Sequence, residues 1–121
     1  MRAIVEAAPN FLRTLDEARR FLVEQDAEAA PARFARLRAE LAEMVQMLSW
    51  APASGRYGRF STANSAQARL RLTRVQRLTA EAALPELREF VLQQYVVLYA
   101  HSSVRAVLLA IKHQRQLVYS A

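Results

Sequence analysis

The sequence predicts an α+β fold in one domain, residues 1–121: an N-terminal strand, a helical hairpin and a C-terminal antiparallel β-meander, with an extra helix inserted before the meander. Apolar residues recur at intervals of three and four in the first half of the chain, which is the spacing of an amphipathic helix. The last third is dense in β-branched and aromatic residues, which favour strands. A length of 121 residues leaves room for a single core.

The first half of the chain is predicted to contain a strand and two helices. Segment 2–8 is expected to be a short strand that a proline ends, and Asn10 is placed to cap the helix that follows, over about 10–25. Pro31 suits the first turn of a second helix, because the N–H that proline lacks has no helical partner there. This second helix is expected to end near Trp50, and the short connector makes the two helices antiparallel.

The middle of the chain is predicted to be a loop followed by a helix. Residues 51–64 hold both glycines of the chain together with proline, serine and asparagine, a composition typical of loops. Trp50 and Tyr57, which flank this loop, are expected at the edge of the core, with base stacking as the less favoured alternative. Residues 65–84 fit a helix, although the alternation of arginine and leucine over 69–72 is also typical of a strand. The length of the stretch and its alanine-rich end favour the helix.

The positive charge of the chain is concentrated in its centre. Residues 51–80 carry six arginines and no acidic residue, which equals the net charge of +6 of the whole chain. A local basic block implies an acidic partner, such as nucleic acid, an acidic protein segment or a phosphate-rich surface. The basic insertion, about residues 60–84, is therefore a candidate contact surface for nucleic acid or a protein partner, or else a solvated face. Its candidate partner-binding residues are Arg69, Arg71, Arg74 and Arg77.

The C-terminal third is predicted to form a β-hairpin that turns over residues 100–104, with a further strand or extended tail over 114–119. Alternate residues of a strand face opposite sides, and both sides of this hairpin are apolar. The helical hairpin can cover one side. The other side must be buried by the helix predicted over 65–84, by a second copy, or by a segment of another protein. The hairpin residues assigned to partner contact are Tyr95, Val97, Tyr99, Val107, Leu109 and Ile111.

The composition argues against several classes of function. The chain has no cysteine, which excludes disulfides, thiolate metal sites and a cysteine nucleophile. His101, expected to be exposed in the hairpin turn, and His113 lack a nearby carboxylate pair, so no metal site is predicted, and no cofactor motif is found. No apolar run approaches the ~18 residues of a membrane span, and the N-terminus does not resemble a signal peptide. A cytoplasmic protein without membrane contact is therefore expected.

The order of elements and three short strings resemble the RelE/ParE superfamily of bacterial toxins from type II toxin–antitoxin systems. The strings are PASGR, with Pro52, Gly55 and Arg56; LRE at 87–89 followed by YVVLY at 95–99; and IKHQRQ at 111–116. The resemblance spans nearly the whole chain and implies a small antiparallel sheet backed by helices. Compact members pass almost directly from the first string to the second, whereas the insertion at about 60–84 intervenes here.

The resemblance implies a toxin that inhibits bacterial growth and is neutralised by a cognate antitoxin in a hetero-oligomer. The ParE branch, whose members poison DNA gyrase and catalyse no reaction of their own, is favoured. The reason is that the C-terminal region lacks the dense set of arginines, lysines and acidic residues that is usual in nuclease members. The alternative is a metal-independent, ribosome-dependent mRNA endonuclease of the RelE branch. A further alternative is an inactive, toxin-derived binding module.

The nuclease alternative assigns catalytic roles to four residues. Such chemistry needs a general base, a general acid and positive charge aimed at the transferring phosphoryl group. His113 or Tyr119 would move protons, while Arg88 and Arg115 would supply charge. His113 and Arg115 are expected to share one side of an extended strand. In the alternative interpretation they are sheet-edge residues, and Tyr119 only packs.

Overall fold

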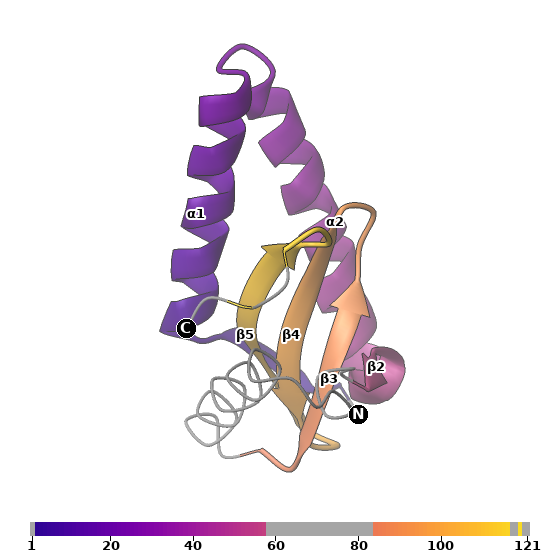
Figure 1. Ribbon diagram of the computed structural model, residues 1–121. Coiled ribbons are helices and arrows are strands. Elements are labelled where there is room, and N and C mark those ends of the chain that lie inside the picture. The colour runs from indigo at the N-terminus through magenta and orange to yellow at the C-terminus, as the bar shows by residue number, and fades with distance from the viewer. Residues whose placement is uncertain (1, 58–83, 117–118, 120–121) are drawn as a thin grey trace, which may run out of the picture.

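The computed structural model describes residues 2–57, 84–116 and 119, and in this part of the chain it forms a five-stranded sheet with a helical hairpin (Figure 1). The strand order is β1-β5-β4-β3-β2; β1 is parallel to β5, and the other neighbours are antiparallel. The elements are β1 (Ile4–Ala7), α1 (Pro9–Gln25), α2 (Ala30–Trp50), the 3-10 helix η1 (Pro52–Ser54), β2 (Arg56–Tyr57), β3 (Glu86–Val91), β4 (Tyr95–His101) and β5 (Arg105–His113).

These elements confirm the predicted α+β class, with its N-terminal strand, helical hairpin and C-terminal antiparallel meander. The helix predicted over 65–84 lies outside the described residues, apart from Leu84. The two-residue strand β2 was not predicted, since segment 51–64 was expected to be a loop. The expectation of a strand over 114–119 is wrong for residues 114 and 115, which form a turn after β5.

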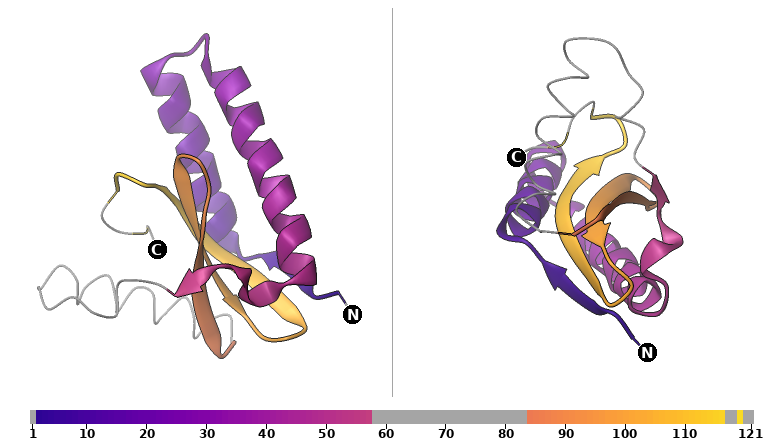
Figure 2. Two further views of the ribbon diagram at one scale, coloured as in Figure 1. Left: turned by 90° about the vertical axis from the view of Figure 1, so that its right-hand side faces the viewer. Right: turned by 90° about the horizontal axis from the view of Figure 1, so that it is seen from below.

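The helical hairpin covers one face of the sheet, and its tip extends past the end of the sheet (Figures 1 and 2). Residues spaced by three and four along α2 meet the inward side chains of β4 and β5, as the periodicity predicted. The core on this face consists of Phe11, Leu37, Leu41, Met44, Leu48, Leu92, Tyr95, Val97, Tyr99, Ala106, Leu108 and Ile111.

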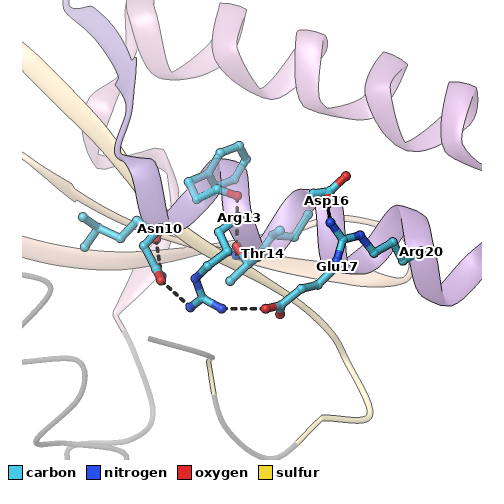
Figure 3. Close-up of polar contacts among 9 residues, drawn as sticks. Asn10, Arg13, Thr14, Asp16, Glu17 and Arg20 are labelled. Carbon is cyan, nitrogen blue, oxygen red and sulfur yellow. Dashed lines mark hydrogen bonds and ion pairs between the residues drawn. The ribbon is translucent and has the colours of Figure 1, made fainter.

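The start of α1 is hydrogen-bonded to β5 through Asn10, a residue expected from the sequence to cap the helix. The helix begins at Pro9 without a side-chain cap, so the prediction that Asn10 caps it is wrong. The carboxamide of Asn10 instead donates to the carbonyl of Leu109 at 2.9 Å, and its oxygen accepts from Arg13 at 2.6 Å (Figure 3). One turn on, the buried hydroxyl of Thr14 accepts the N–H of Ile111 at 3.0 Å. Side chains of α1 therefore satisfy backbone groups of β5 beyond the point where β1 ends.

The second face of the central strands is apolar and buried, as the two-sided pattern predicted. Its side chains are removed from water within the single chain, so neither a second copy nor a partner is needed to bury them. Of the described residues, Ala8, Leu84, Leu87 and Tyr119 pack against this face. The second-face side chains of β4 and β5 are Val96, Leu98, Ala100, Val107, Leu109 and Ala110, each at most 5% exposed.

A β-bulge in the β4–β5 pair changes which residues share a face. Leu98 pairs with Ala110 but Tyr99 pairs with Leu108, so Leu109 is an extra residue. The expectation of strict alternation along β5 is therefore wrong. Of the residues assigned to partner contact, Val107 and Leu109 lie on the second face, the other four lie on the helix face, and all six are buried.

Replacing Leu48 with alanine tests the helix-side core. The Leu48 side chain is 0% exposed, and truncating a fully buried leucine costs about 2–5 kcal/mol in transfer and cavity terms. The free energy of unfolding, measured in urea, should fall by that amount. Met47→Ala is the matched control, because this neighbour on α2 is 51% exposed and should change the stability by less than about 0.5–1 kcal/mol. Equal losses in the two variants would contradict this assignment of the core.

Candidate functional site

The PASGR string is held against β3 and β4 by hydrogen bonds from two side chains. The hydroxyl of Tyr99 donates to the carbonyl of Pro52 at 2.7 Å and accepts the N–H of Gly55 at 2.9 Å. The guanidinium of Arg88 donates to the carbonyl of Gly55 at 2.9 Å. We refer to Pro52, Gly55, Arg88 and Tyr99 as the loop clamp. It fixes the short strand β2 at the edge of the sheet.

Gly55 is required in the loop clamp because of space. A Cβ at this position would lie 2.6 Å from the carbonyl oxygen of Glu89 and 2.6 Å from the hydroxyl oxygen of Tyr99. Real Cβ contacts are essentially never below 3.0 Å. The backbone of Gly55 has a φ of −73°, which any residue can adopt. The close approach of the loop to β3 therefore accounts for the glycine.

Arg88 is engaged on three sides. Besides Gly55, its Nε donates to Nε2 of His101 at 3.0 Å, and its guanidinium lies over the ring of Tyr57, 4.1 Å from the ring centroid. Because arginine is always protonated, Nε2 of His101 must accept, which leaves the proton on Nδ1 to be donated to the carbonyl of Ser102 at 3.1 Å. His101 is 6% exposed, so the prediction that it is exposed is wrong.

A second polar cluster lies on the opposite face of β3. Glu89, 6% exposed, accepts the hydroxyl of Tyr119 at 2.5 Å, and its other oxygen lies 3.4 Å from Nε of Arg56. Burial, and then the negative charge of Glu89, raise the pKa of Tyr119 far above its usual value. Tyr119 is therefore a protonated donor, and it also packs against the second face.

His113 and Arg115 lie at the other end of the sheet. His113 ends β5, where its ring meets the edge of Tyr95 with centroids 5.3 Å apart and its Nδ1 accepts the N–H of Arg115 at 3.2 Å. Arg115 lies in the following turn, so the expectation that it shares one side of an extended strand with His113 is wrong. Both residues line a cleft of about 930 Å³.

The cleft lies between the helical hairpin and the end of the sheet. Its walls come from α1, α2, the β3–β4 turn and the end of β5. Sequence reasoning missed it, because a cleft between elements distant in the sequence leaves no local pattern. A partial signal was present, since Arg33 and Arg36 stand one helical turn apart on α2. The charged residues that line the cleft are Glu17, Arg20, Glu24, Arg33, Arg36, Glu40, Lys112 and Arg115.

The four residues assigned to catalysis are not brought to one place. Arg88 is on the helix face of β3 within the loop clamp, whereas Tyr119 bonds to Glu89 on the opposite face. His113 pairs with Tyr95, and Arg88 pairs with Tyr99, four residues further along β4. The described residues therefore do not combine these four side chains around one phosphate.

The remaining candidates have different outcomes. Arg69, Arg71, Arg74 and Arg77 lie outside the described residues. Trp50 and Tyr57 were expected at the edge of the core, but they are 62% and 66% exposed. Each ring instead carries a cation: Arg2 lies 4.4 Å from the ring centroid of Trp50, and Arg88 covers Tyr57.

Neither a protein-family model nor a curated protein sequence matches this chain. Within the part of the chain that the structure describes, no group of three or more histidine or acidic residues could hold a metal ion. In the same part, no helix is long and apolar enough to cross a membrane.

Replacing Tyr99 with phenylalanine tests the loop clamp. The variant removes the hydroxyl that serves both Pro52 and Gly55 and leaves a partly buried N–H and carbonyl without that partner, at a cost of about 1–3 kcal/mol. The free energy of unfolding should fall by that amount, and amide exchange at Gly55 should accelerate. Tyr57→Phe is the control, because it removes the hydroxyl of an exposed ring and should leave both quantities near wild type. Unchanged exchange at Gly55 in Tyr99→Phe would refute the clamp.

The raised pKa of Tyr119 predicts a loss of stability in alkali. Tyrosine in the unfolded chain releases its proton near pH 10, whereas Tyr119 keeps its proton in the folded chain. The contribution of Tyr119 to the free energy of unfolding is therefore fully present below about pH 10. Above that pH it falls, by up to about 1.4 kcal/mol per pH unit. Urea unfolding between about pH 10 and 11.5 should give a shallower decline in Tyr119→Phe than in wild type. Identical slopes would show that Tyr119 ionises normally.

Proposed function

We propose that this chain is the toxin of a type II toxin–antitoxin system, that it acts in the cytoplasm by poisoning DNA gyrase, and that a cognate antitoxin neutralises it in a hetero-oligomer. The loop clamp is the observation that carries this proposal. PASGR, LRE and YVVLY are separate strings in the sequence, yet three hydrogen bonds join residues of all three: Pro52, Gly55, Arg88 and Tyr99. Strings that match by chance have no reason to interlock. Their convergence therefore supports a shared fold behind the resemblance.

The sheet topology supports the same proposal. The resemblance implied a small antiparallel sheet backed by helices, and in the described residues a helical hairpin packs on one face of a sheet whose meander is antiparallel. The first strand returns to the sheet beside the last one, with Ile4 opposite Arg105. This arrangement places the N-terminal strand and the C-terminal meander in one unit.

The arrangement of the candidate catalytic residues favours gyrase poisoning over mRNA cleavage. A nuclease needs a base, an acid and an available cation at one phosphate. Arg88 is instead engaged by Gly55, His101 and Tyr57. Tyr119 is held by Glu89, and its raised pKa keeps the phenol protonated, so it is not available as a base. A mechanism that works by binding alone requires none of these groups to be available.

Controlled expression in a bacterial host tests this proposal. Wild-type chain should stop growth, induce the DNA-damage response and yield DNA covalently cleaved by gyrase. His113→Ala should remain toxic, because the proposed mechanism needs no proton transfer at this residue. Co-expression of the antitoxin encoded beside the toxin should restore growth.

Two outcomes would contradict the proposal, and each would identify the function that replaces it. Arrest of translation with cut mRNA and no DNA damage, abolished in His113→Ala, would establish the ribonuclease alternative. Unchanged growth with folded, abundant protein would establish an inactive binding module. Circular dichroism of purified His113→Ala supplies the control that any lost toxicity is not lost folding.

A further inference from the structure

The cleft between the helical hairpin and the sheet holds cations that the rest of the described chain does not neutralise. Some of its charged residues are already engaged: Arg20 pairs with Asp16 at 2.8 Å, and Glu17 pairs with Arg13 at 2.5 Å. Glu40 accepts the N–H of Gln93 at 3.0 Å.

Three guanidinium groups and one carboxylate remain at the cleft without an ion pair or a side-chain hydrogen bond among the described residues: Arg33, Arg36, Arg115 and Glu24. All four residues are exposed. Glu40 keeps its negative charge when it accepts an N–H, so the charge balance includes it. Of the charged residues that line the cleft, five are basic and three are acidic, which leaves a positive excess. A concave, positively lined site concentrates anions.

The cationic side chains of the cleft offer a ligand hydrogen-bond donors and no acceptors. Guanidinium groups only donate, and His113 has its Nδ1 occupied by the N–H of Arg115, so the proton of its neutral ring is on Nε2. The nearby carbonyls of Gln93 and Gln94 already accept bonds from Gln114. An extended peptide brings an N–H donor at nearly every residue and would need acceptors. A phosphodiester backbone brings acceptors only and therefore fits these cationic groups better.

An aromatic ring lies beside these cations. Phe21 lines the cleft from α1 and is 50% exposed. Proteins that bind single strands combine a basic groove with aromatic rings on which unpaired bases stack. Arg33 and Arg36 stand one turn apart on α2, with Cβ atoms about 5–6 Å apart, close enough to bind neighbouring phosphates of one strand.

We propose that this cleft binds the phosphodiester backbone of single-stranded nucleic acid through Arg33, Arg36 and Arg115, with a base stacked on Phe21. This inference does not depend on the toxin proposal, because it rests on the charge and hydrogen-bonding character of the cleft alone. It also differs from the basic insertion, because these residues lie on α1, α2 and the turn after β5.

Binding of a fluorescein-labelled 12-nucleotide oligothymidylate to the full chain, followed by fluorescence anisotropy at several salt concentrations, tests the inference. Wild type should bind with a salt-dependent Kd. The double variant Arg33→Ala with Arg36→Ala should weaken binding about tenfold and reduce the slope of log K against log salt by about 1.4, since each phosphate contact on a single strand contributes about 0.7. Phe21→Ala, made in the wild-type chain, should also raise the Kd but should leave the slope of log K against log salt nearly unchanged.

Arg38→Ala is the matched control, because Arg38 is exposed on the same helix but does not line the cleft. It should change the Kd by about twofold or less. Thermal melting of each variant checks that the fold is intact, which is expected because Arg33 and Arg36 are exposed.

Several results would overturn the inference. They are no binding by wild type, a Kd and slope unchanged in the double variant, or an equal loss in Arg38→Ala. A 12-residue polyglutamate that binds more tightly through the same arginines would assign the cleft to an acidic peptide instead. Failure here is distinguishable from failure of the toxin proposal, since toxicity in cells and oligonucleotide binding by purified protein are measured separately.

Discussion

The central strands β4 and β5 are apolar on both faces, and the need to remove both faces from water determines how the rest of the chain is placed. On one side this need is met by the stripes of α1 and α2. On the other side, the described residues Ala8, Leu84 and Tyr119, which lie outside the strands, pack against the sheet together with Leu87 of β3. The edge of β5 needs hydrogen-bond partners as well as cover, and β1 supplies them as far as Leu108, after which side chains of α1 continue.

The same reasoning accounts for the two polar clusters on β3. Neighbouring residues of a strand face opposite sides, so Arg88 enters the helix-side layer and Glu89 the other. A charged group brought into either layer is costly unless it is paired and hydrogen-bonded. Arg88 receives a carbonyl, an imidazole and an aromatic ring, while Glu89 receives a phenol and a guanidinium. These groups stabilise the fold, and their position therefore says little about chemistry.

The elements set by local periodicity could be predicted from the sequence, and those set by pairing could not. The stripe of α2 and the two apolar faces of β4 and β5 are visible in a single pass along the chain. The extra residue Leu109 is not, because a bulge is defined by the partner strand and shifts every later side chain to the other face. The two-residue strand β2 pairs with β3 where the Tyr99 hydroxyl and Arg88 hold the preceding loop, and these contacts are distant in the sequence. The prediction of a catalytic site from four residues failed for the same reason. Residue types at the right spacing do not reveal which of the polar groups are already hydrogen-bonded within the fold.

Whether a polar group is already bonded separates structural from functional arginines in this protein. Arg88 and Arg33 have the same side chain, but Arg88 is held by hydrogen bonds to His101 and Gly55, while Arg33 lines a cleft and makes no side-chain hydrogen bond with the described residues. A ligand that reoriented the guanidinium of Arg88 would break its bonds to His101 and Gly55, and the free energy of those bonds would be subtracted from the affinity. No such loss applies at Arg33, so recognition of an anion by this chain is expected at the cleft rather than at the string that carries the resemblance.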